Sequence, residues 1–211
     1  RGGPMSWLPN PPDGTSICAG FDGSERDDWT AIKAETQSGF IFTPRYGPDL
    51  RPAIWNPRDF DGRIPRGQVH AAWSEIVDRY DLRRAYCDPG FHDETSWETE
   101  IEEWAVEWPL LDGNPRFLQF PTTSAQRMYP AIRRLEADLP TLTHDGCPIT
   151  TAHMRNARKI LARTGRTYTL GKPAAHQKID AAVTTVLAHE AAADERAAGW
   201  IIEPDYAAIS Y

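Results

Sequence analysis

The pattern of hydrophobic and polar positions near the start of the chain predicts short β-strands. The apolar run from Ser16 to Phe21 ends at the turn sequence Asp22-Gly23, and residues 29–36 alternate well enough to pair with it as a hairpin. Phe40-Ile41-Phe42 predicts a third strand. The first part of the fold is therefore expected to be antiparallel.

Further along the chain, the spacing of apolar residues changes to that of amphipathic helices. The predicted helices are residues 69–80, 97–108, 124–139 (kinked at Pro130), 149–163 and 178–190. The predicted strands between them are residues 84–87, 117–120, 141–144 and 167–170. Strands come first and then alternate with helices, so the pattern predicts an α/β fold. We expect a mixed sheet, in which antiparallel hairpin strands are followed by parallel strands, with helices on both faces.

Prolines set the boundaries of this fold. Residues 1–15 are rich in proline and glycine and lack apolar periodicity, which predicts a linker or arm before a single domain over residues 16–211. Residues 44–66 contain Pro44, Pro48, Pro52, Pro57 and Pro65. These prolines forbid a helix and allow at most short edge strands, so a long loop is expected there.

Composition narrows the class of protein. The chain has 211 residues, of which 40% are hydrophobic, and this is enough for one sizeable core. It contains no apolar run as long as a membrane span and no secretory leader, so a soluble, unexported protein is expected. It starts at Arg1 rather than Met, as expected of a piece of a longer polypeptide or of a processed tag. Its three cysteines lack metal-binding spacing, which fits a reducing cytoplasm.

Charge is segregated along the chain although the net charge is −7. Residues 93–107 carry acidic residues but no Lys or Arg, whereas residues 153–178 carry basic residues but no Asp or Glu. The basic residues can form a surface for DNA phosphates, or they can be an ordinary solvated face. The candidates for DNA binding are Arg155, Arg158, Lys159, Arg163, Lys172 and Lys178, the first four of which are expected to share one helix.

Three aspartates carry the candidate chemistry. Asp22 and Asp88 follow predicted strands, and Asp180 begins the last predicted helix. Each has an ordinary structural explanation, as a turn residue or as a favourable charge at a helix N-terminus. Together, carboxylates from a sheet and from a helix packed across it can form a cluster that needs cations to neutralise it. Oxygen ligands suit Mg²⁺ or Mn²⁺, and two such ions about 3.5–4 Å apart can catalyse phosphodiester hydrolysis.

The residues around these aspartates resemble the nuclease domain of bacteriophage terminase large subunits, a ribonuclease H-like family. The resemblance spans roughly residues 16–191 and depends mainly on the order and spacing of short motifs. The motifs are Gly20-Phe21-Asp22-Gly23-Ser24, Asp28-Trp29-Thr30-Ala31, Ala85-Tyr86-Cys87-Asp88-Pro89 and Lys178-Ile179-Asp180-Ala181-Ala182-Val183. Leu142-Thr143-His144-Asp145-Gly146 and Asn156-Ala157 are similar to a further segment of that family.

The resemblance implies a metal-dependent DNA endonuclease that cuts concatemeric viral DNA during genome packaging. Asp22 would bridge two divalent ions, Mg²⁺ or Mn²⁺. Asp88 and Asp180 would each complete one ion site, and Asp28 would be an accessory ligand. The implied partners are double-stranded DNA, an N-terminal packaging ATPase domain, the portal and the small terminase subunit. The implied location is the host cytoplasm, at the procapsid, with no membrane.

Other interpretations of the same residues stay open. A Holliday-junction resolvase-like or transposase-like nuclease of the same fold would use the same acidic cluster. A non-catalytic module that docks on DNA or portal would use the aspartates only in turns.

The segment Gly165 to Pro173 does not have the spacing of a phosphate-binding loop, so no ATP hydrolysis is expected. His92, His144, His153, His176 and His189 lack metal-ligand spacing and are expected at the surface or in turns.

Overall fold

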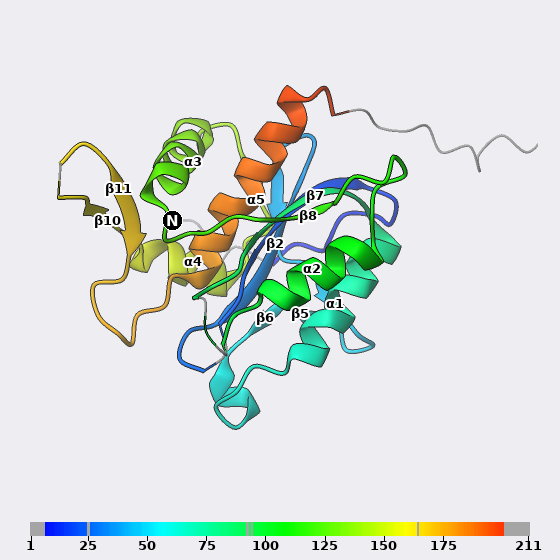
Figure 1. Cartoon of the computed structure of the whole chain (residues 1–211), viewed down its shortest axis with the longest axis horizontal. Helices are drawn as coiled ribbons and strands as arrows, with labels where there is room; N and C mark the ends of the chain where they lie inside the picture. Colours follow the sequence, from blue (N-terminus) through cyan, green and yellow to red (C-terminus); the bar gives the residue numbers. More distant parts are fainter. Residues whose placement is uncertain (1–6, 25, 92, 94, 164, 201–211) are drawn as a thin grey trace, which may run out of the picture.

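A mixed β-sheet forms the centre of the protein in the computed structural model, which describes residues 7–24, 26–91, 93, 95–163 and 165–200 (Figure 1). Within these residues the sheet has seven strands in the order β8-β7-β1-β2-β3-β9, with β6 also paired to β2. Its strands are β1 (Ser16–Asp22), β2 (Thr30–Thr36), β3 (Phe40–Phe42), β6 (Ile54–Trp55), β7 (Asp81–Asp88), β8 (Phe117–Gln119) and β9 (Thr143–His144). The pairs β1–β2 and β2–β3 are antiparallel, whereas β1–β7 and β7–β8 are parallel. The predicted mixed sheet is confirmed.

Helices cover both faces of this sheet, as the sequence pattern predicts (Figure 1). They are α1 (Arg66–Arg79), α2 (Glu98–Glu107), α3 (Ala125–Asp138), α4 (Pro148–Asn156) and α5 (Asp180–Ala197). Alternate residues of β1 point to opposite faces. Phe21 packs with Trp73, Trp97 and Trp104 in one buried cluster beneath α1 and α2, and Cys18 belongs to a second cluster with α3 and α5. Both faces of the sheet are therefore buried.

Helix α5 lies unusually close to β1. An added Cβ on Gly20 would lie 2.4 Å from the carbonyl oxygen of Thr184 and 2.5 Å from the amide nitrogen of Ala188. Both are backbone atoms of α5, so only glycine permits this approach. The absence of a side chain at residue 20 therefore sets the distance between the helix and the strand that ends at Asp22.

The prediction of one helix over residues 149–163 is correct as far as Asn156 and wrong for the residues that follow. Helix α4 ends at Asn156, where the next residue, Ala157, takes an extended backbone with ψ 134°. The chain continues as a hairpin of β10 (Arg158–Leu161) and β11 (Tyr168–Gly171). The hairpin supplies the backbone hydrogen bonds of residues 158–161 from a segment further along the chain, which a local apolar pattern does not reveal.

The proline-rich segment contains only short strands, as predicted, but it is not an open loop. It forms β4 (Arg45–Tyr46), β5 (Arg51–Pro52), β6 and a 3₁₀ turn, Pro57–Phe60. Tyr46, Ala53, Trp55 and Ile64 are buried in the cluster beneath α1 and α2. The segment therefore belongs to the core.

The described part of the N-terminal arm packs against the domain. The Trp7 side chain donates to the Asp145 carboxylate at 3.1 Å, and the Leu8 amide donates to the Asp145 carbonyl at 2.7 Å. The Gly14 amide donates to the Arg79 carbonyl at 2.6 Å. The boundary at residue 16 stays a prediction. Among the described helices, none combines the length and the apolar character needed to span a bilayer.

Candidate metal centre

Asp22 and Asp88 lie side by side at the ends of two parallel strands. They are register partners at the last pair of β1 and β7. Thr122, which follows β8, holds the Asp88 carboxylate, since its hydroxyl donates to Oδ2 at 2.5 Å and its amide to Oδ1 at 3.2 Å. The Gly90 amide donates to Oδ1 at 3.3 Å. The carboxyl edge of the sheet thus brings the first two predicted site residues together.

Asp180 reaches the same place from the first residue of α5. It is buried, with 7% of its surface exposed, and its Oδ2 has no hydrogen-bond partner among the described residues. Burial and the nearby charge of Asp28 raise the pKa of Asp180 to about 6, against opposing backbone hydrogen bonds and Lys172. A buried, unpaired carboxylate oxygen is costly unless a proton or a cation satisfies it.

One cavity of about 360 Å³ is lined by all three aspartates and by Asp28. Burial and the charges of Asp88, Asp180 and Asp28 raise the pKa of Asp22 well above its usual range. This mutual repulsion is the electrostatic signature expected of a site for hard divalent cations. The carboxylates and the unsatisfied oxygen of Asp180 therefore fit such a cation in chemistry.

The carboxylates share the cavity without forming a finished ligand shell. Among the described residues, no group of three or more His, Cys, Asp and Glu side chains is already arranged to hold a metal ion. Asp88 Oδ1 accepts from the Gly90 and Thr122 amides, whereas Oδ2 accepts from the Thr122 hydroxyl alone among the described residues, so Oδ2 keeps a lone pair for another ligand.

Asp28 is engaged by two lysines. Lys172 and Lys178 both donate to its Oδ1, at 2.5 and 2.7 Å. Burial alone would raise the pKa of Asp28, but the hydrogen bonds and charges of the two lysines lower it overall. Two of the predicted DNA-binding residues therefore pair with the predicted accessory ligand, and of these two Lys172 lines the acidic cavity.

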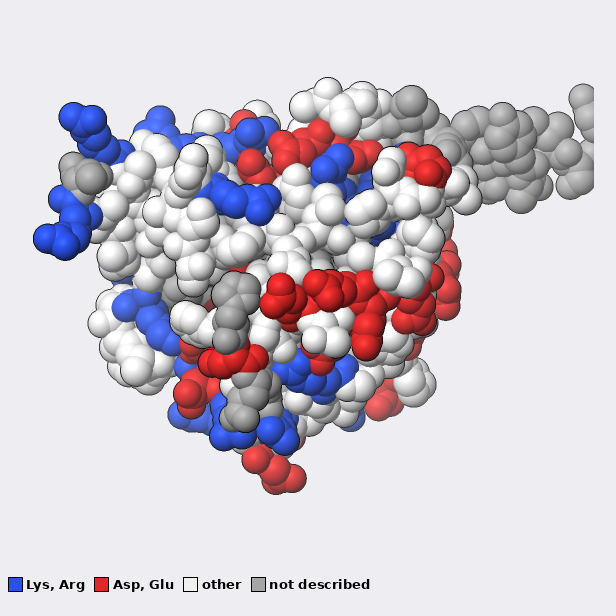
Figure 2. Space-filling model, viewed as in Figure 1, with Lys and Arg blue, Asp and Glu red and all other residues white. Residues whose placement is uncertain are grey.

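The other predicted DNA-binding residues do not share a helix, which corrects the expectation from the sequence. Arg155 lies on α4, Arg158 and Lys159 lie on β10, and Arg163 lies in the turn that follows. Lys159 pairs with Glu136 at 2.7 Å. Figure 2 shows Lys and Arg side chains at the hairpin, on the left of the view, and Asp and Glu side chains gathered over α2. Since Leu170 and Gly171 of β11 line the acidic cavity, the basic hairpin leads into it.

Sequence reasoning missed two residues that support the site. The sequence could have indicated Thr122 as a partner of Asp88. Thr122 closely follows β8, which is parallel to β7, so both residues lie at the same edge of the sheet. His153 was expected at the surface, but it is buried and its Nδ1 accepts the Ala181 amide at 3.0 Å. Burial and Lys178 lower the pKa of His153 to about 4, so a neutral ring fixes the start of α5.

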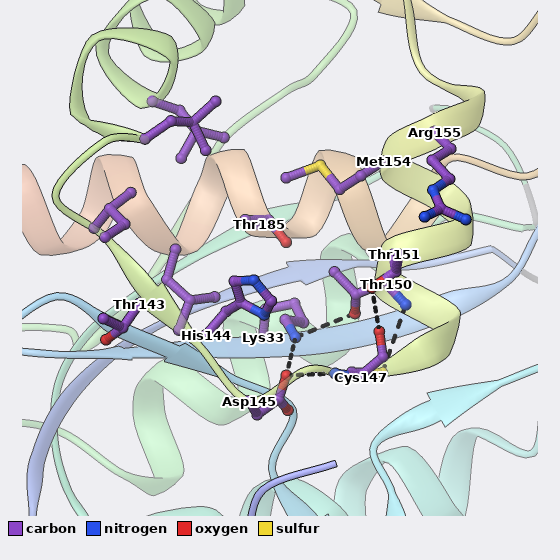
Figure 3. A pocket seen from close by; sticks show the side chains of 14 residues that line it. Lys33, Thr143, His144, Asp145, Cys147, Thr150, Thr151, Met154, Arg155 and Thr185 are labelled. Atoms are coloured by element: carbon purple, nitrogen blue, oxygen red, sulfur yellow. Dashed lines mark hydrogen bonds and ion pairs between the residues drawn. The ribbon is translucent and has the colours of Figure 1, made fainter. Parts of the chain in front are cut away.

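A larger cavity, of about 490 Å³, has none of the three aspartates in its lining. Figure 3 shows the residues that line it. On its wall the buried Lys33 ammonium donates to Thr43 and Thr150 and lies 3.9 Å from Asp145. Burial lowers the pKa of Lys33, and the negative charge of Asp145, which would raise this pKa, offsets only part of that effect. Asp145, part of a motif that carried the resemblance, therefore joins β2, α4 and the N-terminal arm instead of entering the acidic cavity.

Sequence comparisons find similar proteins in two bacteriophages. No protein-family model matches the chain. It is 28% identical to the Gene 13 protein of Mycobacterium phage D29 over 191 residues, and 27% identical to that of Mycobacterium phage L5 over 195 residues. Each alignment covers 86% of this chain but only 30% of the phage protein, so the chain spans less than a third of those relatives.

Solved structures show the same arrangement of elements. The large terminase nuclease of the thermophilic phage G20c with bound magnesium matches with a TM-score of 0.62 at 13% identity, over 88% of this chain and 90% of that one. The same nuclease with bound cobalt matches with a TM-score of 0.60 at 14% identity, over 88% and 90% of the two chains. The bacteriophage HK97 large terminase matches with a TM-score of 0.58 at 21% identity, over 88% of this chain and 41% of that one. The chain therefore has the ribonuclease H-like fold of the nuclease domains of phage large terminases.

Proposed function

We propose that this chain is the nuclease domain of a phage large terminase and cleaves concatemeric viral DNA during genome packaging. The observation that carries the proposal is the meeting of Asp22, Asp88 and Asp180 at one cavity. These residues come from the ends of two adjacent strands and the first turn of α5, and Asp180 retains an oxygen without a partner. A purely structural set of turn aspartates has no reason to be gathered in this way.

The protein's own residues have distinct parts in the proposed reaction. Asp22 lies beside Asp88 and lines the same cavity as Asp180, which supports a role for it as a ligand that would be shared by the cations. Asp88 would complete one ion site, with Thr122 orienting its carboxylate, and Asp180 would complete the other. When bound, the divalent cations supply the Lewis acidity that activates water and stabilises the leaving oxygen.

The class of cation follows from the ligands. Carboxylate oxygens prefer hard ions, which favours Mg²⁺ or Mn²⁺ for this chain. The G20c nuclease, which has the same fold, was solved with bound magnesium and with bound cobalt. We propose two divalent ions, because the three carboxylates flank one cavity from two strands and a helix.

The proposal includes partners outside the described chain. Double-stranded DNA is the substrate, and exposed Arg155, Arg158 and Arg163 extend a basic surface from the hairpin. The phage relatives and the HK97 large terminase are much longer than this chain, which supports an additional packaging ATPase domain in the whole protein. The portal, the small terminase subunit and a site of action at the procapsid in the host cytoplasm belong to the same proposal.

Single substitutions of the three aspartates test the proposal. Asp22→Asn, Asp88→Asn and Asp180→Asn are each expected to reduce Mn²⁺-dependent cleavage of supercoiled plasmid at least 100-fold, because each removes a negatively charged ligand. Calorimetric titration with Mn²⁺ should show weaker or absent binding, while circular dichroism shows a folded protein. Asp49→Asn is the matched control, since the Asp49 side chain is 76% exposed on another part of the surface.

The outcomes separate the competing functions. Cleavage at the parent rate by any of the three variants would remove that residue from the proposed site. A parent protein that takes up no Mn²⁺ and cuts no DNA would instead indicate a non-catalytic docking module. Preference for branched DNA over linear duplex would indicate a resolvase-like enzyme.

A further inference from the structure

One carboxylate oxygen beside the acidic cavity receives two ammonium groups. Asp28 Oδ1 accepts from Lys172 at 2.5 Å and from Lys178 at 2.7 Å. The two lysines lie 144 and 150 residues from Asp28 in sequence, so the fold itself makes this arrangement. Asp28 differs in this respect from Asp180, whose buried Oδ2 has no described partner.

Surrounding contacts fix Lys178 and Asp28 more firmly than Lys172. Lys178 donates a second hydrogen bond, to the Asp27 carbonyl at 2.7 Å, and the Asn156 side chain donates to the Lys178 carbonyl at 2.9 Å. The Asp28 amide donates to the Ser24 hydroxyl at 3.3 Å. Lys178 therefore anchors Asp28 from the side of α4 and α5.

Lys172 is the lysine that faces the cavity. It lines the cavity together with the end of β11, and 32% of its side chain is exposed, compared with 19% for Lys178. Asp28 is its one hydrogen-bond partner among the described residues, whereas an ammonium group can donate three hydrogen bonds. Lys172 can therefore hold Asp28 and still donate to a ligand.

A DNA backbone that approaches this cavity meets four carboxylates, from Asp22, Asp28, Asp88 and Asp180. Cations bound by the three predicted ligands would offset much of that charge, but a phosphate beside the reacting one still needs a cationic partner. A lysine held at the rim by a neighbouring carboxylate supplies this charge in a fixed position, and so at a lower entropic cost.

We propose that Asp28 is a positioning residue and not a cation ligand: with Lys178 as its anchor, it holds Lys172 where that ammonium group binds a phosphate of the DNA. This inference depends on the proposed nuclease function and replaces the accessory-ligand role that the family resemblance implies for Asp28. It makes the rim of the cavity a phosphate subsite and leaves cation binding to Asp22, Asp88 and Asp180.

Calorimetry with Mn²⁺ alone is the first test. Asp28→Asn is expected to bind Mn²⁺ within about threefold of the parent Kd, whereas Asp180→Asn loses binding. An Asp28→Asn Kd that is tenfold weaker would make Asp28 a ligand and overturn the inference. Asp27→Asn is the matched control, because Asp27 neighbours Asp28 but has an exposed side chain.

DNA measurements are the second test. Lys172→Met is expected to lower kcat/KM for plasmid cleavage at least tenfold, whereas Lys172→Arg keeps most of the activity. In an Asp180→Asn background, which does not cut, Lys172→Met should reduce the slope of log Kd against log salt by about one. The double variant Asp28→Asn/Lys172→Met should cut within threefold of Lys172→Met, because the two residues act as one unit.

The results distinguish this inference from the proposed function. Parent-like cleavage and an unchanged salt slope in Lys172→Met, or fully additive losses in the double variant, would overturn the phosphate subsite while the nuclease function stands. A parent protein that neither binds Mn²⁺ nor cuts DNA would overturn the function itself. Since Lys172 is partly exposed, Lys172→Met tests the inference even if Asp28→Asn folds poorly.

Discussion

At the scale of single residues, His189 lies between two acidic side chains inside the protein. Its Nδ1 lies 2.8 Å from Glu35 and its Nε2 lies 3.0 Å from Asp138. Arg196 pairs with the other oxygen of Glu35. Burial alone would lower the pKa of His189, but the hydrogen bonds and charges of Glu35 and Asp138 raise it overall. The sequence-based expectation of a surface histidine is wrong.

The raised pKa of His189 predicts that its contribution to stability depends on pH. A group with a folded pKa above its unfolded value stabilises most below the unfolded pKa, about 6.5, and loses that effect as pH rises through the folded pKa. The stability difference between the parent and His189→Gln should therefore shrink above pH 6.5, by up to about 1.4 kcal/mol per pH unit. Urea unfolding from pH 6 to 9 measures it.

His176→Gln provides the control for this measurement, because His176 is exposed. Its stability difference from the parent should stay flat over the same range. A His189→Gln difference that is also flat would show that the buried ring is not charged between its two acidic neighbours.

The residues of the candidate site were predictable to different degrees. Asp22, Asp88 and Asp180 could be proposed from short motifs in a fixed order, and the structure brings them together at one cavity. The pairing of Asp28 with Lys172 and Lys178 could not, because those contacts arise only when β11 and α5 return to the sheet. Long-range side-chain partners follow from tertiary packing, which local sequence patterns do not encode.

At the scale of elements, the contact between α5 and β1 leaves no room for a side chain at residue 20. Gly20→Ala would place a methyl group within 2.4 Å of an α5 backbone oxygen. We expect it to lower the free energy of unfolding by about 1–3 kcal/mol or more, because backbone atoms of a packed helix cannot yield as a side chain does. Urea denaturation measures this loss, and Mn²⁺ calorimetry should show weaker binding as α5 carries Asp180 away.

Gly67→Ala is the matched control for Gly20→Ala. Gly67 lies within α1, and nothing lies within 4 Å of an added Cβ there. This variant should be more stable than the parent by about 0.5–1 kcal/mol, because alanine has less freedom to lose on folding. Equal stability of both variants would mean that α5 can move away from the strand without cost.

Elements with strong local patterns were predicted well, and elements that depend on distant partners were not. The hairpin strands and the helices around Trp73 and Trp104 follow from their apolar periodicity. Strand β10 was predicted as helix, because Ile160 and Leu161 extend the apolar pattern of α4. Both side chains are exposed, at 50% and 67%, so they do not report a buried helix face.

At the scale of the whole molecule, the charge distribution predicts where the proposed DNA substrate would bind to a protein with a net charge of −7. Exposed basic residues lie on α4 and at the hairpin, whose strand β11 lines the acidic cavity with Leu170 and Gly171, while α2 presents acidic residues (Figure 2). The double variant Arg158→Gln/Arg163→Gln should bind DNA more weakly than the parent. The slope of its log Kd against log salt should be smaller by about one to two. Fluorescence anisotropy over a salt series, in the Asp180→Asn background, measures both quantities.

Arg51→Gln controls for the loss of a positive charge in this experiment. Arg51 is 60% exposed on β5, outside the hairpin. The Arg51→Gln variant should bind DNA with a Kd within about twofold of the parent and with the same salt dependence. A hairpin variant that behaves like Arg51→Gln would locate the DNA surface elsewhere.

The position of Asp180 at the start of α5 has a consequence for the order of synthesis. The strands that carry Asp22 and Asp88 leave the ribosome first, and α5, which packs against β1, β2 and β7, is the last described helix. A translation product that stops before residue 180 keeps two of the three proposed cation ligands but lacks Asp180 and the helix that packs against β1, β2 and β7. Such a fragment exposes an apolar sheet face next to an incomplete centre, so it is expected to aggregate without ever cutting DNA.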